Sequence, residues 1–319
     1  MTTENFLLDD ANTTDQETVR ISGKVYPWMQ WVYGESKFRK IGGISYLGGF
    51  FLPKKNLDVT GNAAWTTESM EYEDKEKKQA ATVEGFYAGK LDLCFINERH
   101  RYEVSPGDGE GKQYIYSAND FGAAEKMAED LNRNIVDANK KYKVNKKSQF
   151  LVAVKGMEDT PIILTVRNTA ARRISGQTGL KQAFDRTVMA FVNEELKKAN
   201  TSNRLPTRRF WITVGASVDQ NGEPDFQVLG KGNNSKSLTV PAWRNMPGKV
   251  DMAYVQSIHT GPGNKDRFDT LYKDTLSWSK EWDGIKAGSS KETADAAAEH
   301  PTAQQPQTDP ETAAALAAM

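Results

Sequence analysis

Aromatic and basic residues are interleaved along much of this 319-residue chain. Two Trp and two Tyr lie within residues 26–33, several Lys and Arg follow them, and Arg208 and Arg209 directly precede Phe210 and Trp211. Exposed rings stack on unpaired bases for about 1–3 kcal/mol each, while cations follow the phosphate backbone. Because alternate residues of a strand share a face, Arg209 and Trp211 are expected to line one surface. The pattern indicates binding of single-stranded nucleic acid.

The residues expected to contact nucleic acid are aromatic or basic and come from separate parts of the sequence. They are Trp28, Trp31, Tyr33, Lys37, Arg39, Lys40, Lys54, Lys55, Arg99, Arg101, Arg167, Arg172, Arg173, Arg208, Arg209, Trp211, Lys231 and Lys236. Most of the 31 aromatic residues are expected in the core, because large rings dominate core packing. Trp28, Trp31 and Tyr33 are the aromatic residues least readily assigned to the core, because Pro27, Gln30 and Gly34 interrupt any long core element.

Arg172 and Arg173 come just before two glycines and the helix predicted for Gly179–Ala199. Cations near the N-terminus of a helix oppose its dipole. An anion bound at this point would relieve that conflict, which is a further reason to include both arginines among the nucleic-acid contacts.

The net charge of zero conceals three differently charged segments. Residues 1–22 and 287–319 each carry a net charge of −4, so the body between them carries about +8. Acidic ends are commonly no more than solvated tails. Alternatively, the basic body binds a polyanion and the acidic ends compete for the same surface.

No catalytic motif is recognisable in the chain. The glycine-rich segments 107–112 and 230–237 do not match the P-loop pattern, and no GxSxG nucleophile elbow is present. The single cysteine, Cys94, lies between Leu93 and Phe95 and is expected to be buried. One cysteine and three widely separated histidines do not make a zinc site. We therefore expect no catalytic residue, no bound metal and no cofactor.

A group of carboxylates leaves one enzymatic alternative open. Glu71, Glu73, Asp74, Glu84 and Asp92 flank a strand-rich region, as the ligands of a two-metal nuclease would. The mixed charges of residues 68–78 are, however, typical of a solvated surface.

Sequence patterns predict a β-rich centre. Strands are expected in Lys40–Pro53, in Glu84–Val104, in the hairpin of Gln149–Lys155 with Pro161–Arg167, and in Arg208–Ser217 joined by a turn to Asp225–Leu229. Helical periodicity predicts Asn119–Lys140, Gly179–Ala199 and a third helix that contains Phe268 and ends at Gly284. The expected fold class is α+β, with an OB-like barrel or a sandwich at the centre and about three helices.

Composition divides the chain into three parts. Residues 1–22 are expected to be an acidic flexible segment, 23–286 a folded basic body, and 287–319 a disordered acidic tail rich in Ala, Gln, Pro and Thr. No apolar run approaches the roughly 18 residues that span a membrane, and the acidic N-terminus is unlike a signal peptide. We expect a cytoplasmic protein without a membrane partner.

The order of these parts resembles that of phage- and plasmid-type single-stranded DNA-binding proteins, in which an aromatic and basic β-rich body precedes an acidic tail. The resemblance implies an OB-type barrel and a tail that recruits protein partners. Here the chain ends Ala-Ala-Leu-Ala-Ala-Met instead of in clustered acids and an aromatic residue. No functional residue is carried over, because no motif of that family matches.

The leading hypothesis is a single-stranded DNA-binding protein of replication or recombination that acts by base stacking and phosphate contacts, without catalysis. RNA is the alternative ligand. A strand-annealing recombinase would in addition form homo-oligomers through the helices Asn119–Lys140 and Gly179–Ala199. A structural protein of a virion or filament would need no nucleic acid, and a metal-dependent nuclease would cleave it. Binding that weakens with salt separates the binding proteins from the structural class.

Overall fold

The structure is a computed structural model. It describes residues 26–33, 40–41, 44–45, 48–74, 79–106, 116–118, 120–138, 140–201, 203–229 and 236–278. The two segments expected to be acidic tails, 1–22 and 287–319, lie outside the described residues.

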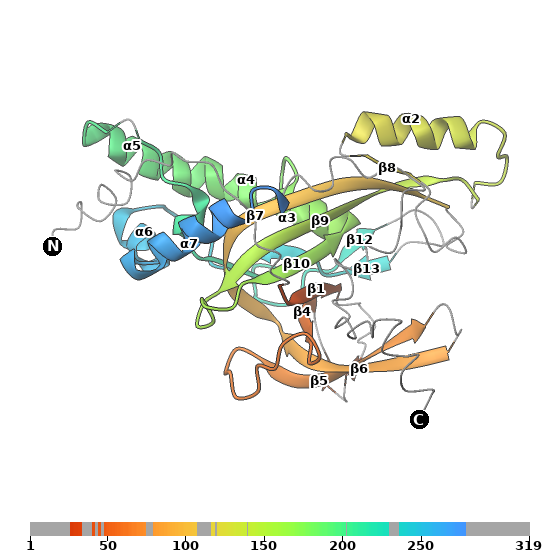
Figure 1. The fold of residues 1–319 in the computed structure, drawn as a ribbon, viewed down its shortest axis with the longest axis horizontal. Helices are drawn as coiled ribbons and strands as arrows, with labels where there is room; N and C mark the ends of the chain where they lie inside the picture. The colour runs from red at the N-terminus through yellow and green to blue at the C-terminus, as the bar shows by residue number, and fades with distance from the viewer. Residues whose placement is uncertain are drawn as a thin grey trace, which may run out of the picture. The chain divides into compact units, whose positions relative to one another are not determined.

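One large sheet forms the centre of the described part of the chain (Figure 1). Its strands follow the order β14-β11-β7-β9-β10-β1-β4-β6-β5, with β8 beside β7. β1 and β10 run parallel, and the other described pairs run antiparallel. The strands are β1 (Trp28–Tyr33), β4 (Gly48–Pro53), β5 (Thr66–Asp74), β6 (Gln79–Ala88), β7 (Lys90–Ser105), β8 (Tyr116–Ala118), β9 (Lys143–Val154), β10 (Ile162–Arg167), β11 (Ile212–Ala216) and β14 (Pro241–Trp243).

The strand order leaves β14 and β5 as the two edges of this sheet. The sheet is therefore open and does not close into a barrel, whereas the expected mixture of helices with a β-rich centre is confirmed. Two small hairpins form separate sheets: β2 (Lys40–Ile41) with β3 (Ile44–Ser45), and β12 (Gln227–Leu229) with β13 (Lys236–Leu238). The predicted hairpin of β9 and β10 is present, with Leu151 opposite Ile163.

A helix is present at each of the three places that periodicity predicts, but the first of them ends at Asn132 and not at Lys140, and the predicted end at Gly284 lies outside the described residues. The helices are α2 (Phe121–Asn132), α3 (Asn168–Ser175), α4 (Leu180–Phe184), the π-helical turn η1 (Asp185–Met189), α5 (Ala190–Lys198), the 3₁₀ turn η2 (Thr207–Arg209), α6 (Met252–Ile258) and α7 (Pro262–Asp274). α4, η1 and α5 form one continuous helical run, which matches the predicted Gly179–Ala199. α3 and α6 are not predicted by periodicity, because they have only 8 and 7 residues and so show little of it.

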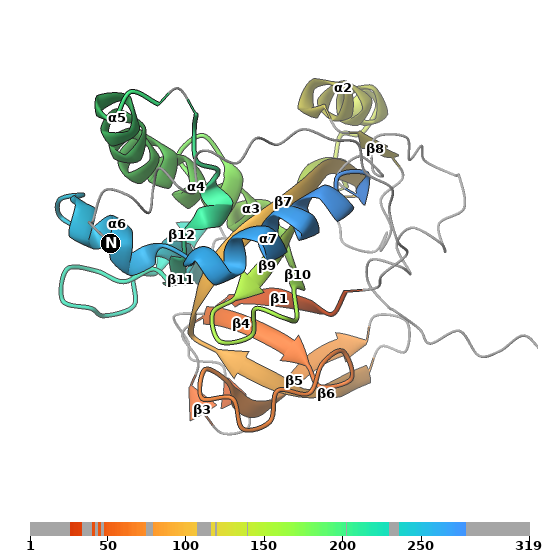
Figure 2. The same ribbon diagram turned by 60° about the vertical axis from the view of Figure 1, so that its left-hand side comes forward.

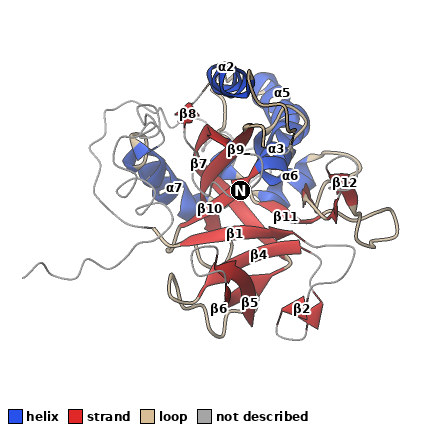
Figure 3. Ribbon diagram, turned by 90° about the vertical axis from the view of Figure 1, so that its right-hand side faces the viewer, coloured by secondary structure: helices blue, strands red, loops and turns tan. Residues whose placement is uncertain are grey.

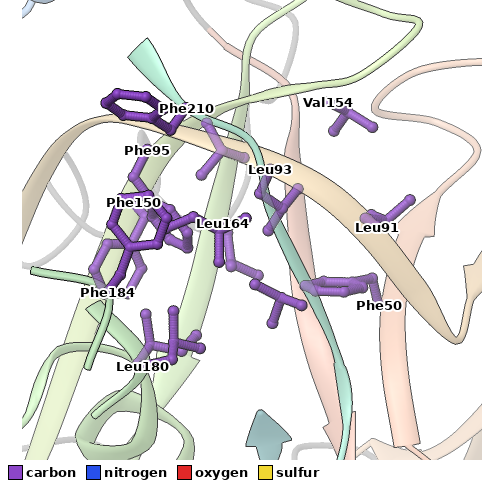
Figure 4. Packing of buried hydrophobic residues seen from close by; sticks show 14 of the residues in the cluster. Phe50, Leu91, Leu93, Phe95, Phe150, Val154, Leu164, Leu180, Phe184 and Phe210 are labelled. Atoms are coloured by element: carbon purple, nitrogen blue, oxygen red, sulfur yellow. The ribbon is translucent and has the colours of Figure 1, made fainter. Parts of the chain in front are cut away.

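One face of the sheet packs against α3, α4 and α5 and carries the larger core (Figure 4). Phe95, Phe150 and Leu164 of β7, β9 and β10 meet Leu180 and Phe184 of α4. Burying each such side chain contributes about 1.5–3 kcal/mol. We call this side of the sheet the α4 face. α2 packs on the same face farther along β7 and β9.

The opposite side of the sheet packs against α7 (Figures 2 and 3). Cys94, Leu151 and Ile163 of the same three strands lie there with Trp211 and with Phe268 of α7. We call this side the α7 face. β7 and β9 extend past α7 toward β8 and α2 (Figure 1), so the helix covers only part of their length.

Candidate nucleic-acid interface

Three neighbouring strands carry a row of cations across the α7 face. Lys147 of β9 lies directly opposite Arg101 of β7 on one side and Arg167 of β10 on the other. Strand alternation puts all three on the α7 face, since Leu151 and Ile163 of that face lie an even number of residues away in β9 and β10. Like charges in directly opposed positions destabilise a sheet. A bound anion would stabilise this arrangement.

The adjacent row on the same face is polar and hydrogen-bonded. Arg99, Gln149 and Thr165 lie opposite one another in β7, β9 and β10. Nε of Arg99 donates to Oε1 of Gln149 at 2.8 Å, and Nε2 of Gln149 donates to Oγ1 of Thr165 at 3.2 Å. Gln30 of β1 continues the row beside Thr165. These bonds fix the side chains in place at the edge of the cationic row.

We call the five cations Arg99, Arg101, Lys143, Lys147 and Arg167 the basic face. Lys143 and Arg167 are exposed, whereas Arg101 and Lys147 are each only 1% exposed. Buried charges are costly unless an opposite charge pairs with them. The cations at the ends of the surface are therefore the ones that a ligand in solution can reach.

Glu103 is the only carboxylate that β7, β9 and β10 contribute to the α7 face from Arg99 onward, among the side chains that are described. Its Oε1 lies 2.8 Å from Nη2 of Arg101, so these two charges form a buried ion pair. One carboxylate against five cations leaves the strands of this surface with a positive excess.

An aromatic ring borders the basic face where the chain leaves α7. The guanidinium carbon of Arg99 lies 4.5 Å from the centre of the Trp278 ring. The indole is partly buried against the core of the α7 face. Trp278 therefore brings a flat surface next to the cations, which is the combination that single-stranded nucleic acids require.

Cations on the α4 face have different surroundings. Nζ of Lys181 lies 2.6 Å from Oε2 of Glu98, and Nζ of Lys146 donates to Oγ of Ser175 at 3.2 Å. Burial lowers the pKa of Lys146; Glu98 opposes that shift, and Arg172 and Lys181 add to it. These lysines connect α3 and α4 to the sheet, so we assign them to the packing of the fold.

Arg208, Arg209 and Trp211 do not form the exposed basic and aromatic surface that their spacing suggested. Both arginines are buried and bind the carboxylate of Asp269 in α7, Arg208 with Nε 2.7 Å from Oδ1. Trp211 is 4% exposed and packs edge-on against Phe268. These residues hold α7 on the sheet, because the chain before β11 passes under the helix.

Trp28, Trp31 and Tyr33 are also engaged in packing. Trp31 is 7% exposed and packs edge-on against Phe50, and Trp28 is half-buried in the core of the α7 face. The hydroxyl of Tyr33 donates to the carbonyl of Arg167 and accepts a hydrogen bond from the backbone N–H of Ala170. Burial raises the pKa of Tyr33, and the bond from Ala170 partly offsets that rise. Trp31 belongs to the core although Pro27 and Gly34 flank its strand, because β1 lies in the interior of the sheet.

Arg172 and Arg173 lie in the last turn of α3, not at the start of the following helix. The helix dipole favours cations at that end, so the expected electrostatic conflict is wrong. Arg172 is exposed, and Arg173 is half-buried and donates to Oε1 of Gln227.

The remaining predicted contacts are separate from the basic face or cannot be placed. Lys54 and Lys55 are exposed in the turn after β4, and the side chain of neighbouring Asn56 bonds to the carbonyl of Trp28. That turn is at the start of β1, whereas Arg167 lies beside its end. Lys37, Arg39 and Lys231, and the side chains of Lys40 and Lys236, lie outside the described residues.

Of the eighteen predicted contacts, the structure brings together Arg99, Arg101 and Arg167. Sequence reasoning missed Lys143 and Lys147, which complete the surface. The alternation of Lys143, Asn145, Lys147 and Gln149 could have revealed them, but the predicted strand began only at Gln149.

Groups that could support catalysis are few in the described part of the chain. No cluster of three His, Cys, Asp or Glu residues there is placed to hold a metal ion. Asp92 accepts a hydrogen bond from Thr213 and lies 3.8 Å from Nζ of Lys155. Cys94 is fully buried, as predicted; burial raises the pKa of its thiol, and Arg209 and Arg208 only partly offset that rise.

No helix within the described ranges has the length and apolar character needed to cross a membrane. No protein-family model matches the chain, and no curated protein and no solved structure matches it either. The basic face is therefore interpreted from its own geometry.

Proposed function

We propose that the protein binds single-stranded nucleic acid on the basic face, without catalysis, in replication or recombination. The observation that carries the proposal is the row Arg101, Lys147 and Arg167, in which three cations stand in directly opposed positions on adjacent strands. Such a row lowers the stability of the free sheet and suits a ligand with closely spaced negative charges. Nucleic acid is such a ligand, since its phosphates dominate binding.

Phosphates would contact the exposed cations first. Lys143 and Arg167 lie at two ends of the surface and are open to solvent. A base would stack on Trp278 beside Arg99. This assignment replaces stacking on Trp31 and Trp211, whose rings are in the core.

The test is the fluorescence anisotropy of a labelled 30-nucleotide oligo-dT during titration with the full chain at low salt. Oligo-rU of the same length and duplex DNA are titrated in parallel, to compare RNA and double-stranded ligands. We expect binding of single strands and weaker binding of duplex. Arg167→Gln should weaken binding about five- to tenfold, on the order of 1 kcal/mol.

The matched control is Arg133→Gln, because the side chain of Arg133 is 75% exposed on α2, away from the basic face. It should leave the affinity unchanged. The proposal fails if no oligonucleotide binds at low salt, and that result would favour the structural or assembly alternative. It also fails if the two substitutions weaken binding equally, since general charge would then explain the effect.

A further inference from the structure

A cavity of about 360 Å³ lies on the α4 side of the sheet, between the start of α4 and the strand β14. Leu180 and Trp243, which line it, belong to the core of the α4 face. The basic face is on the opposite side of the sheet, so the cavity is a separate place in the molecule. Its volume is at the lower end of the roughly 300–1,000 Å³ of small-molecule sites, which suits one nucleotide unit.

Two arginines from different elements line the cavity. Arg173 comes from the last turn of α3, and its guanidinium is oriented by a hydrogen bond to Gln227. Arg244 follows β14, and its Nη1 donates to the carbonyl of Ala216 at 2.7 Å. Each arginine is anchored by one bond and has further N–H groups. Guanidinium groups held in this way bind phosphate oxygens through charge-assisted, commonly paired hydrogen bonds.

The rest of the wall mixes apolar and polar side chains and includes one carboxylate. Trp243 is partly buried, with its ring centre 5.3 Å from that of Phe184, which holds the indole in place. Met246, also in the wall, is 55% exposed. Asp225 contributes a carboxylate. A carboxylate accepts a hydrogen bond from the exocyclic amine of a base such as cytosine, and thymine has no such donor.

We propose that this cavity binds a nucleoside monophosphate unit, with its phosphate at Arg173 and Arg244 and its base against Trp243, and that it prefers bases with an exocyclic amine at Asp225. The unit would be either a free mononucleotide or the 5′-phosphorylated end of a strand. The site does not depend on the basic face, which would hold the interior of a strand.

The test is isothermal titration of the full chain with dCMP, deoxycytidine, dTMP and inorganic phosphate. We expect dCMP to bind best, with deoxycytidine weaker by about tenfold or more because it lacks the charged group. dTMP should bind several-fold more weakly than dCMP. Arg173→Gln and Arg244→Gln should each weaken dCMP about tenfold, and Asp225→Asn should reduce the difference between dCMP and dTMP.

The matched control is Arg186→Gln. Arg186 is exposed in η1, which continues α4, but it does not line the cavity. This substitution should leave dCMP binding unchanged. The proposal is overturned if dCMP gives no binding up to about 1 mM, a very weak affinity, or if deoxycytidine binds as well as dCMP. Equal effects of Arg173→Gln and Arg186→Gln would also overturn it. The ligand comparison uses the unsubstituted protein, so the test stands even if one variant fails to fold.

Competition separates the two sources of the ligand. A 5′-phosphorylated hexanucleotide that displaces dCMP better than its 5′-hydroxyl form assigns the cavity to strand ends, and equal weak displacement by both assigns it to free nucleotides. Oligo-dT binding by Arg173→Gln and dCMP binding by Arg167→Gln should both equal those of the unsubstituted protein. If dCMP does not bind but oligo-dT does, only the proposal for the cavity fails. If oligo-dT does not bind but dCMP does, only the proposal for the basic face fails.

Discussion

At the scale of single residues, Asp269 has the clearest role. Its carboxylate receives hydrogen bonds from Arg208 and Arg209, and the residue is 8% exposed. Burial alone would raise its pKa, but the bonds and charges of the two arginines outweigh burial and hold the pKa of Asp269 below its usual 3.8. The ring of Tyr272 lies over Arg208, 4.2 Å from the guanidinium carbon. The three charges act together to fasten α7.

Replacing Asp269 by Ala should therefore destabilise the protein by roughly 3–5 kcal/mol, because two buried cations lose their carboxylate. Urea unfolding measures the loss. Asp266→Ala is the control, since Asp266 is exposed one turn earlier on α7 and should change stability by no more than about 0.5 kcal/mol. Equal losses would show that the ion pairs do not hold α7.

Because of Asp269, we expect the stability of the protein to depend on pH. Because the folded pKa of Asp269 is depressed, its contribution is complete above the unfolded pKa, near 3.8, and is lost as the pH falls through the folded value. The free energy of unfolding is measured from pH 6 down to about pH 3, as far as folding stays reversible. It should fall more steeply with decreasing pH for the unsubstituted protein than for Asp269→Ala. Parallel curves would contradict the assignment.

At the scale of elements, the start of α3 is held by a tyrosine from another strand. Arg167 is the N-cap residue and provides no side-chain cap, and the phenol oxygen of Tyr33 accepts the N–H of Ala170 instead. The hydroxyl also donates to the carbonyl of Arg167 at 3.1 Å. Helix N-termini leave N–H groups without intrahelical partners, so β1 supplies what the sequence of α3 lacks. This contact also orients the end of β10, where Arg167 joins the basic face.

Tyr33→Phe should cost about 1 kcal/mol of stability, since it removes both hydrogen bonds but keeps the ring. It should leave the affinity for oligo-dT within about twofold, or 0.4 kcal/mol, because the hydroxyl acts in folding. Thermal or urea unfolding and anisotropy give the two readouts. Tyr142→Phe serves as control, since the described bonds of Tyr142 involve only its backbone. A large loss of affinity with unchanged stability would instead show that the hydroxyl contacts the strand, since phenylalanine keeps the ring that would stack on a base.

At the scale of the whole molecule, charge is unevenly distributed although the chain is neutral. Three strands that meet only in the folded state concentrate cations on one surface, and the two ends of the chain carry net negative charge. The overall isoelectric point, near 6.9, therefore gives no indication of a polyanion site. Local fields, which depend on where the charges lie, govern such binding.

The salt dependence of strand binding tests this distribution. For single strands, the logarithm of the binding constant falls with the logarithm of salt concentration by about 0.7 for each phosphate contact. Arg167→Gln should reduce that slope by about 0.7, the value for one contact, whereas Arg133→Gln should not change it. Anisotropy titrations at four or more salt concentrations give both slopes. Identical slopes for all three proteins would exclude Arg167 from phosphate contact.

The elements that could be predicted are those whose periodicity is long or whose turn is local. The helical run 180–198 and the hairpin of β9 and β10 were found because each is specified by residues close in sequence. The sequence could not predict that the sheet is open, because this depends on pairings such as β1 with β10. These pairings join residues more than 130 positions apart. Single-sequence patterns contain no information on such partners.

The sequence by itself determined the β-rich core, the main helices, the burial of Cys94 and the separation of basic body from acidic ends, because these follow from composition and local pattern. Tertiary structure alone decided which charges act together. Arg99, Arg101 and Arg167 share a surface with Lys147 because of strand register, while Arg208 and Arg209 meet a carboxylate instead because α7 folds over them. The same basic or aromatic residue can belong to the core, to an ion pair or to a binding surface. Only its neighbours in the folded structure show which of these roles it has.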